Sequence, residues 1–121
     1  MEYELFTEIR NKVASVSAQL FDTARAIAQT DVITSLAELA ENENYVKPVL
    51  DESEVINIKG GRHPVVEKMI DHDMFVTNDT YLNNTNHSVS VITGPNMAGK
   101  STYMRQGAII VIMAQIGSFV P

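Results

Sequence analysis

The feature that most constrains the fold of this chain is the stretch GPNMAGKST at residues 94–102. It matches the pattern G-x-x-x-x-G-K-S/T, in which a glycine-rich loop joins a strand to the start of a helix. The flanking residues fit that context, because HSVSVITG at 87–94 predicts an apolar strand and residues 99–117 predict a helix. The sequence therefore predicts the strand–loop–helix unit of a P-loop NTPase, with its turn at Gly94 and Pro95.

Each position of this loop has a physical role in holding phosphate. Gly94 and Gly99 allow backbone angles that bring the main chain close to a ligand. Lys100 would neutralise the β- and γ-phosphates, and Ser101 would give its hydroxyl to Mg²⁺. Thr102 stands where its hydroxyl can reach the α-phosphate. Inward-pointing amides at the start of the helix would come from Met97, Ala98, Gly99 and Lys100. We therefore expect ATP or ADP with Mg²⁺ at this loop.

Hydrolysis of ATP also needs carboxylates that hold the water shell of the metal and orient the attacking water. No aspartate or glutamate follows Asp79 in the chain. The upstream pair Asp51 and Glu52 follows only two apolar residues and Pro48, which a central strand does not tolerate. We interpret that pair as a solvated turn. The sequence thus predicts no catalytic residue here and no hydrolysis by this chain alone.

The first 44 residues predict helices. Apolar residues separated by three or four positions form one stripe along a single long helix. The stripe consists of Leu5, Ile9, Val13, Val16, Leu20, Ala24 and Ile27. Thr30 and Asp31 are suited to cap a second helix over residues 32–42. We therefore expect two helices that meet near residue 30.

The residue pattern is no longer helical from Tyr45 onward. Alternation at 54–59, a turn at Gly60–Gly61 and the run MFVT at 74–77 predict short strands of a small sheet. The expected fold class is mixed α/β, with long N-terminal helices followed by a small β-sheet and a truncated P-loop NTPase unit. His63 is expected to be a packed or hydrogen-bonded turn residue.

Composition and charge narrow the possible functions. The chain has no cysteine, and its three histidines lack the spacing of a metal site. Residues 1–54 carry four basic and eleven acidic side chains, a balance that disfavours contact with a phosphate backbone, so we expect no DNA binding by this chain alone. The N-terminus lacks the features of a signal peptide, and the longest apolar run, 108–114, is too short to cross a bilayer. We expect a cytoplasmic protein without a membrane contact.

Four segments resemble the start of the ATPase domain of the MutS family of DNA mismatch repair proteins. They are GGRHPVVE at 60–67, FVTNDTYL at 75–82, ITGPNMAGKSTYMRQ at 92–106 and AQIGSFVP at 114–121. The segment NMAGKSTYMRQ is typical of the mismatch-repair branch, whereas condensin-like and recombination ATPases more often carry Gly-Ser before G-K-S. The front of the chain is similar to the end of the helical lever region. The resemblance implies a lever segment at 1–44 and the N-terminal part of an ABC-type P-loop ATPase domain at 45–121.

The resemblance also implies roles for two further residues. Family members stack adenine on an aromatic side chain in the position of Phe75, and a side-chain amide matching Asn96 reaches towards the γ-phosphate. Phe75 could instead belong to the core, and Asn96 could simply shape the turn. Met104 and Met113 on the helix after the loop are expected in the core.

The resemblance implies that the parent protein couples ATP binding and hydrolysis to the recognition of mismatched DNA and dimerises through its ATPase domain. In the family, the acidic Walker B strand and the signature segment follow the point at which this sequence stops, so we expect a portion of that domain. Two alternatives stay open: a structural segment that binds no nucleotide, and part of another ABC-type or P-loop DNA-repair ATPase. We also expect self-association through the apolar surface at 109–116 and the stripe at 9–27.

Overall fold

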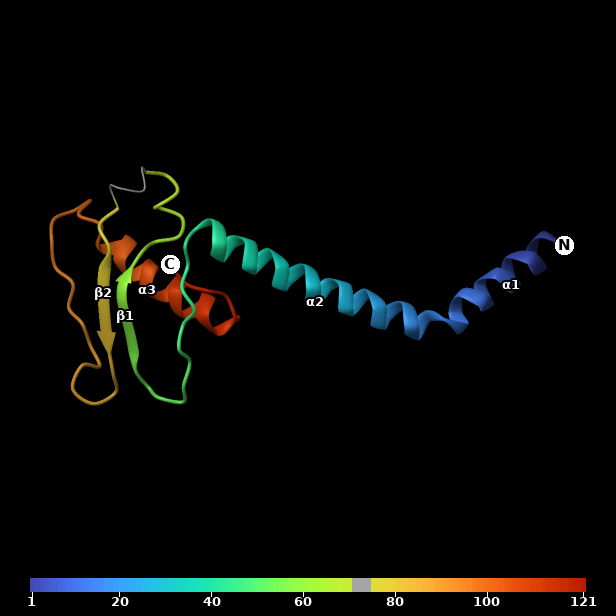
Figure 1. Cartoon of the computed structure of the whole chain (residues 1–121), viewed down its shortest axis with the longest axis horizontal. Helices are drawn as coiled ribbons and strands as arrows, with labels where there is room; N and C mark the ends of the chain where they lie inside the picture. The colour runs from blue at the N-terminus through green and yellow to red at the C-terminus, as the bar shows by residue number, and fades with distance from the viewer. Residues whose placement is uncertain (71–74) are drawn as a thin grey trace. The chain divides into compact units, whose positions relative to one another are not determined.

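The structure, a computed structural model, describes residues 1–70 and 75–121 (Figure 1). The elements follow one another as α1 (Glu2–Ser15), α2 (Ser17–Asn42), β1 (Ile56–Gly61), β2 (Asn78–Leu82) and α3 (Lys100–Gln115). Two compact units divide the chain, one at Met1–Leu36 and the other at Ala37–Pro121. Helices and a small sheet occur together, so the mixed α/β class predicted from the sequence is confirmed.

The break between the first two helices lies at Val16 and not at Thr30, where the sequence had placed it. Val16 has φ −108° and ψ 5° and ends α1. The hydroxyls of Ser15 and Ser17 donate to the carbonyls of Lys12 and Ala14 at 2.7 and 2.8 Å. Such bonds compete with the helical ladder and explain an interruption here. The Thr30 hydroxyl donates to a carbonyl four residues earlier at 2.9 Å, as in a continuing helix, so the expected cap at Thr30 and Asp31 is wrong.

Apolar side chains on α1 and on the N-terminal part of α2 are exposed. Leu5 is 61% exposed and Ile27 is 65% exposed, and α1 has no buried residue. Apart from Val16 at the break, the apolar residues predicted to form a stripe do lie on helices, but they are exposed in the described part of the chain. In residues 1–70 and 75–121, no helix has both the length and the apolar character that a bilayer crossing requires.

Strands β1 and β2 form an antiparallel hairpin-like sheet. Ile58 pairs with Thr80 and Gly61 pairs with Asn78, with an irregularity between the two pairs. Gly60 occupies this irregularity with φ 60°, a conformation that glycine adopts without strain. The first strand overlaps the predicted run at 54–59, which is confirmed.

The second strand lies later than the sequence predicted. Residues 75–77 of the expected run 74–77 precede β2, and position 74 lies outside the described residues. Pairing explains the shift, because the partners of β1 begin at Asn78, opposite Gly61. The Asp79 carboxylate then fixes the bulge by accepting a hydrogen bond from the Gly60 amide at 2.8 Å and one from the Lys59 ammonium at 3.0 Å. The Gly60 bond, followed by the Lys59 bond, lowers the pKa of the Asp79 carboxyl.

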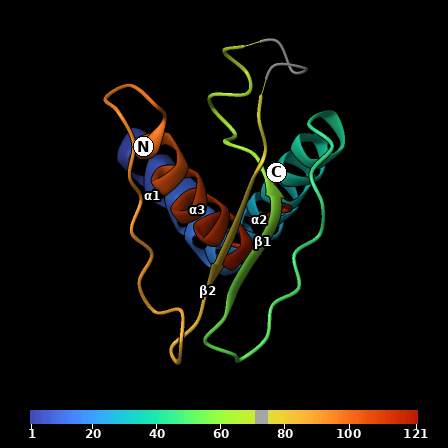
Figure 2. The ribbon, with the colours of Figure 1, turned by 90° about the vertical axis from the view of Figure 1, so that its left-hand side faces the viewer.

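Helix α3 packs against the β1–β2 sheet and contributes Ile110 and Ala114 to the core (Figure 2). Its buried residues Ile110 and Ala114 form a cluster with Val120, against which Ile58 and Met113 pack. The chain after α3 returns to pair with the segment after α2, because Val46 and Val120 exchange two backbone hydrogen bonds of 2.9 Å. The core thus joins both ends of the second unit.

The two methionines of α3 behave differently. Met113 packs against the core as expected, but Met104 is 56% exposed, so its expected core position is wrong. The face of α3 that meets the sheet carries Tyr103, Gln106 and Ile110, which are spaced three and four residues apart. Met104 lies off that face.

Residues 87–93 do not form the strand that the sequence predicted before the loop. Val89 and Val91 are 80% and 83% exposed, and the segment is irregular. A strand requires a neighbour that completes its hydrogen bonds. Among the described residues the sheet contains β1 and β2 alone, so no strand pairs with this segment.

Candidate nucleotide-binding loop

The loop between residue 93 and α3 owes its shape to three residues with positive φ. Gly94 has φ 151°, Met97 has φ 66° and Gly99 has φ 83°. Gly99 is also the N-cap of α3, so the helix begins at Lys100, one residue after the predicted start, and it ends at Gln115, two residues before the predicted end. The two glycines adopt angles that disfavour other residues, which agrees with the backbone freedom expected of them.

The Lys100 side chain folds back over the loop. Its ammonium donates hydrogen bonds to the carbonyl oxygens of Gly94 and Pro95, the second at 2.7 Å. The positive charge is therefore held above the loop, at the N-terminal end of α3. The positive end of the helix dipole adds to this charge, and together they make the loop attractive to an anion.

The backbone amides around the start of α3 are the expected donors to a ligand. The Tyr103 amide donates to the Gly99 carbonyl at 2.9 Å, which closes the first turn of α3. The amides that precede it in this turn have no acceptor within the helix. The Ala98 amide differs from the expectation, since it donates to the Pro95 carbonyl at 3.4 Å within the loop. Ser101 is exposed and Thr102 is half-buried.

The remaining predicted site residues lie at two places. Asn96 and Met97 are exposed in the loop itself. Phe75 is half-buried in the segment that leads into β2, three residues before Asn78. Asp51 and Glu52 are exposed, and the Asp51 carboxylate accepts a hydrogen bond from the Ser53 amide at 2.9 Å, so the predicted solvated turn is confirmed.

Tyr103 connects α3 to β2, a contact that the sequence analysis did not predict. The Thr80 hydroxyl donates to the Tyr103 hydroxyl at 2.9 Å, and the Tyr103 hydroxyl donates to the Asp79 carbonyl at 3.2 Å. A tyrosine between helix-forming residues predicts only an amphipathic position. Its partners lie 23 and 24 residues earlier in the chain, beyond the reach of any local pattern.

A second contact brings α3 close to β1. A Cβ atom at Gly61 would lie 3.0 Å from the Gln106 amide nitrogen and 2.7 Å from a methyl group of Ile58. Gln106 is 1% exposed, and neither polar atom of its side chain has a hydrogen-bond partner among the described residues. Glycine at position 61 is therefore required by space, because a larger residue would force apart the sheet and the helix.

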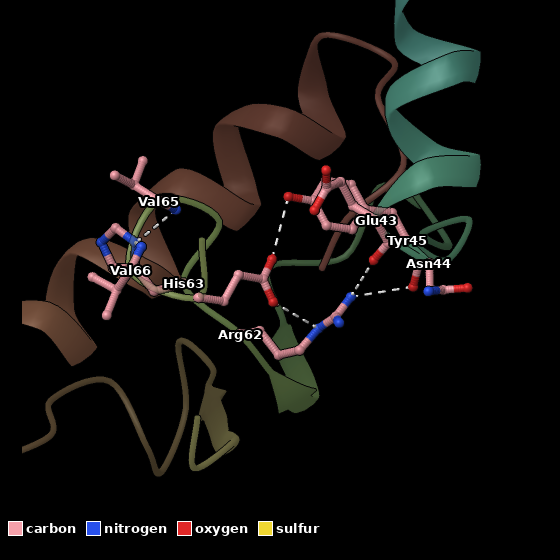
Figure 3. A network of polar contacts seen from close by, with 8 residues as sticks. Glu43, Asn44, Tyr45, Arg62, His63, Val65 and Val66 are labelled. Carbon is pink, nitrogen blue, oxygen red and sulfur yellow. Dashed lines mark hydrogen bonds and ion pairs between the residues drawn. The ribbon is translucent and has the colours of Figure 1, made fainter. Parts of the chain in front are cut away.

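A buried polar network joins the end of α2 to the segment after β1 (Figure 3). Glu67 is fully buried, with the Arg62 guanidinium at 3.4 Å and the Tyr45 hydroxyl at 3.4 Å. Arg62 also donates to the carbonyls of Glu43 and Asn44 at 3.0 and 3.2 Å. One guanidinium thus neutralises a buried carboxylate and satisfies carbonyls just beyond a helix end.

His63 lies beside this network and behaves as predicted. It is 6% exposed, and its Nδ1 accepts hydrogen bonds from the amides of Val65 and Val66 at 3.3 and 3.4 Å. Its role as a packed turn residue is confirmed. In the part of the chain that the structure describes, no group of three or more histidine, aspartate or glutamate side chains could hold a metal ion.

Burial, and then the charge of Glu67, raise the pKa of Tyr45 to about 12 from its usual 10.0. The folded state therefore keeps a proton that the unfolded state loses. We expect stability to be unaffected by this group below pH 10 and to fall as the pH rises from 10.0 to about 12. An ultraviolet titration should show one of the four tyrosines ionising late, and Tyr45→Phe should remove that component. Four superimposable titrations would contradict the burial of this hydroxyl.

Comparison with known proteins places the loop in a family context. The glycine loop, the start of α3 and the Lys100 side chain folded over the loop form an arrangement suited to anions. The family model MutS domain V matches residues 90–121. That match includes the loop and all of α3. The boundary predicted at residue 45 lies outside it and stays a prediction.

Curated relatives extend the similarity to the whole chain. The DNA mismatch repair protein MutS of Alkaliphilus oremlandii is 58% identical over all 121 residues, and those of Lachnoclostridium phytofermentans and Acetivibrio thermocellus are each 57% identical. The chain spans only 13 to 14% of the length of these relatives. The two comparisons together support the MutS-family resemblance found in the sequence.

Proposed function

We propose that this chain is a nucleotide-binding segment of a MutS-type DNA mismatch repair ATPase, and that residues 94–102 hold the phosphates of ATP. The observation that carries the proposal is the position of the Lys100 ammonium, which lies over the loop at the start of α3. The Lys100 charge lies beside the helix amides that have no acceptor within α3. The positive φ angles of Gly94 and Gly99 let the backbone of the same loop come close to a ligand. The names of the relatives supply mismatch repair as the process.

Each loop residue has a defined task in this proposal. Lys100 exchanges its bonds with the Gly94 and Pro95 carbonyls for phosphate oxygens, which carry full negative charge and are stronger acceptors. Ser101 would hold Mg²⁺ through its hydroxyl, and its exposure leaves that hydroxyl accessible. Mg²⁺ would neutralise charge on the phosphates when bound. Thr102 would contact the α-phosphate.

Two other residues would complete the contacts. Asn96 would reach the γ-phosphate from the exposed middle of the loop, and Phe75 would offer its ring to adenine. In the whole protein, we propose that ATP binding and hydrolysis are coupled to mismatched DNA and that the ATPase domains dimerise. The acidic residues required for hydrolysis would come from outside this sequence, because none follows Asp79.

The test is a titration of the chain with ATP and Mg²⁺ followed by amide NMR. We expect saturable shifts at residues 94–102 and no phosphate release above background. Ser101→Ala is the matched control, because it removes the proposed Mg²⁺ ligand from an exposed position and should make the shifts less dependent on Mg²⁺. An absence of shifts at millimolar nucleotide would contradict the proposal. Hydrolysis that disappears in Lys100→Ala would show that the acidic residues are already present.

A structural role without nucleotide is the second candidate function. It is favoured by the irregular segment before the loop, in which Val89 and Val91 are 80% and 83% exposed. A loop whose preceding segment is not held in a strand is less preorganised for phosphate, which weakens binding. The same titration separates the two functions, because a structural segment would show no saturable response at the loop.

A further inference from the structure

Among the described residues, Tyr103 is the one side chain of the first turn of α3 that makes hydrogen bonds to the sheet. Its hydroxyl accepts a bond from the Thr80 side chain at 2.9 Å and donates one to the Asp79 carbonyl at 3.2 Å. The hydroxyl therefore serves as acceptor and donor at once, to two successive residues of β2. Two such bonds fix both the position and the direction of the phenol.

The strand that Tyr103 contacts is itself held firmly. Asp79 accepts bonds through its carboxylate from the Gly60 amide and the Lys59 ammonium at 2.8 and 3.0 Å. Its carbonyl, which accepts the hydrogen bond from the Tyr103 hydroxyl, therefore belongs to a residue that is tied to the bulge of β1. The close approach of Gln106 to Gly61 sets a second point of contact one turn further along α3.

These contacts lie between the two ends of the proposed nucleotide site. Lys100 begins α3 three residues before Tyr103, and Phe75 precedes β2 by three residues. We propose that Tyr103 is a positioning residue that fixes the phosphate loop relative to the segment carrying Phe75, so that one nucleotide can engage both. This inference rests on the proposed nucleotide binding, and it assigns to Tyr103 no direct contact with the ligand.

The physical reason is preorganisation. A ligand that binds at two places gains affinity from the second contact only when the two places are already held at the right separation. Loss of the Tyr103 hydroxyl leaves each end intact but allows their separation to vary. The predicted signature is therefore a weaker ATP complex with unchanged binding of a ligand that contacts the phosphate end alone.

Calorimetric titrations of ATP and of inorganic tripolyphosphate, each with Mg²⁺, test this signature. For Tyr103→Phe we expect ATP affinity to fall about fivefold to tenfold, as for the loss of one or two hydrogen bonds, while tripolyphosphate affinity stays within about twofold. Thr80→Val should reproduce the effect, and the double variant should lose little more, because both changes break the same link. Circular dichroism confirms that each variant is folded.

Tyr81→Phe is the matched control. Tyr81 also lies on β2, but its hydroxyl accepts a hydrogen bond from the Asn83 side chain at 3.2 Å, in an exposed position. We expect that variant to bind both ligands like the original chain. Equal weakening of both ligands by Tyr103→Phe, or no change in either, would overturn the positioning role and leave nucleotide binding standing. An original chain that binds neither ligand would overturn the proposed function itself.

Discussion

Lys100→Ala is expected to lower the affinity of the chain for ATP and Mg²⁺ by about tenfold to a hundredfold, because it removes a charged hydrogen-bond donor to phosphate. The fold should survive, since the Lys100 ammonium bonds to carbonyls of an exposed loop and not to the core. Calorimetry with the chain gives the affinity, and thermal unfolding gives the stability. Unchanged affinity would remove Lys100 from the site.

The same change can be measured in a whole protein. Residues 1–121 would replace the matching stretch of the MutS protein of Alkaliphilus oremlandii, to which they are 58% identical. We expect that chimera to hydrolyse ATP and its Lys100→Ala form to have lost nearly all turnover. Lys12→Ala is the control, because Lys12 is an exposed lysine that pairs with Glu8 on α1 and takes no part in the loop or the sheet. Equal activity of the two lysine variants would contradict the assignment.

Arg62→Met is expected to destabilise the chain by about 3–5 kcal/mol, the range found when one partner of a buried ion pair is removed. Glu67 would be left as an uncompensated charge at 0% exposure, and the Glu43 and Asn44 carbonyls would lose their donor. Urea unfolding measures the loss. The exposed pair of Lys59 and Asp79 supplies the control, because an ion pair in solvent contributes little to stability and Lys59→Met should cost far less than Arg62→Met.

A second variant isolates the buried charge. Arg62→Met combined with Glu67→Gln removes both charges, so most of the lost stability should return. If the double variant is as unstable as Arg62→Met alone, the guanidinium acts mainly through the helix-end carbonyls. A loss below about 1 kcal/mol in the single variant would mean that the Arg62–Glu67 pair contributes little to stability, contrary to what the full burial of Glu67 predicts.

The parts of the fold that depend on local chemistry were predicted from the sequence. Gly99 ends the loop and Lys100 begins α3, because a glycine with positive φ suits an N-terminal cap. His63 is buried in a turn, as the Gly-Gly and Pro neighbours indicated. The break at Val16 was missed, because apolar periodicity continues through it and only the competing serine hydroxyls mark it.

The parts that depend on distant partners were not predicted. The run at 87–93 has the composition of a strand but lacks a neighbour among the described residues, and composition alone does not supply one. The buried pair of Arg62 and Glu67 resembles ordinary surface charge in the sequence, since its burial depends on Tyr45 and on the end of α2. The site residues themselves stay predictions until a nucleotide is titrated.

Gly61 places a limit on which sequences this sheet can accept. Its φ is not in the left-handed region, so no backbone requirement selects glycine there, and the restriction comes from the side chains of Ile58 and Gln106 and from the Asn78 carbonyl. A single methyl group would meet those two side chains at 2.7 and 3.0 Å. A substitution at this position of β1 would consequently be felt in the second turn of α3, so the helix that follows the loop limits which residues evolution can place in the strand.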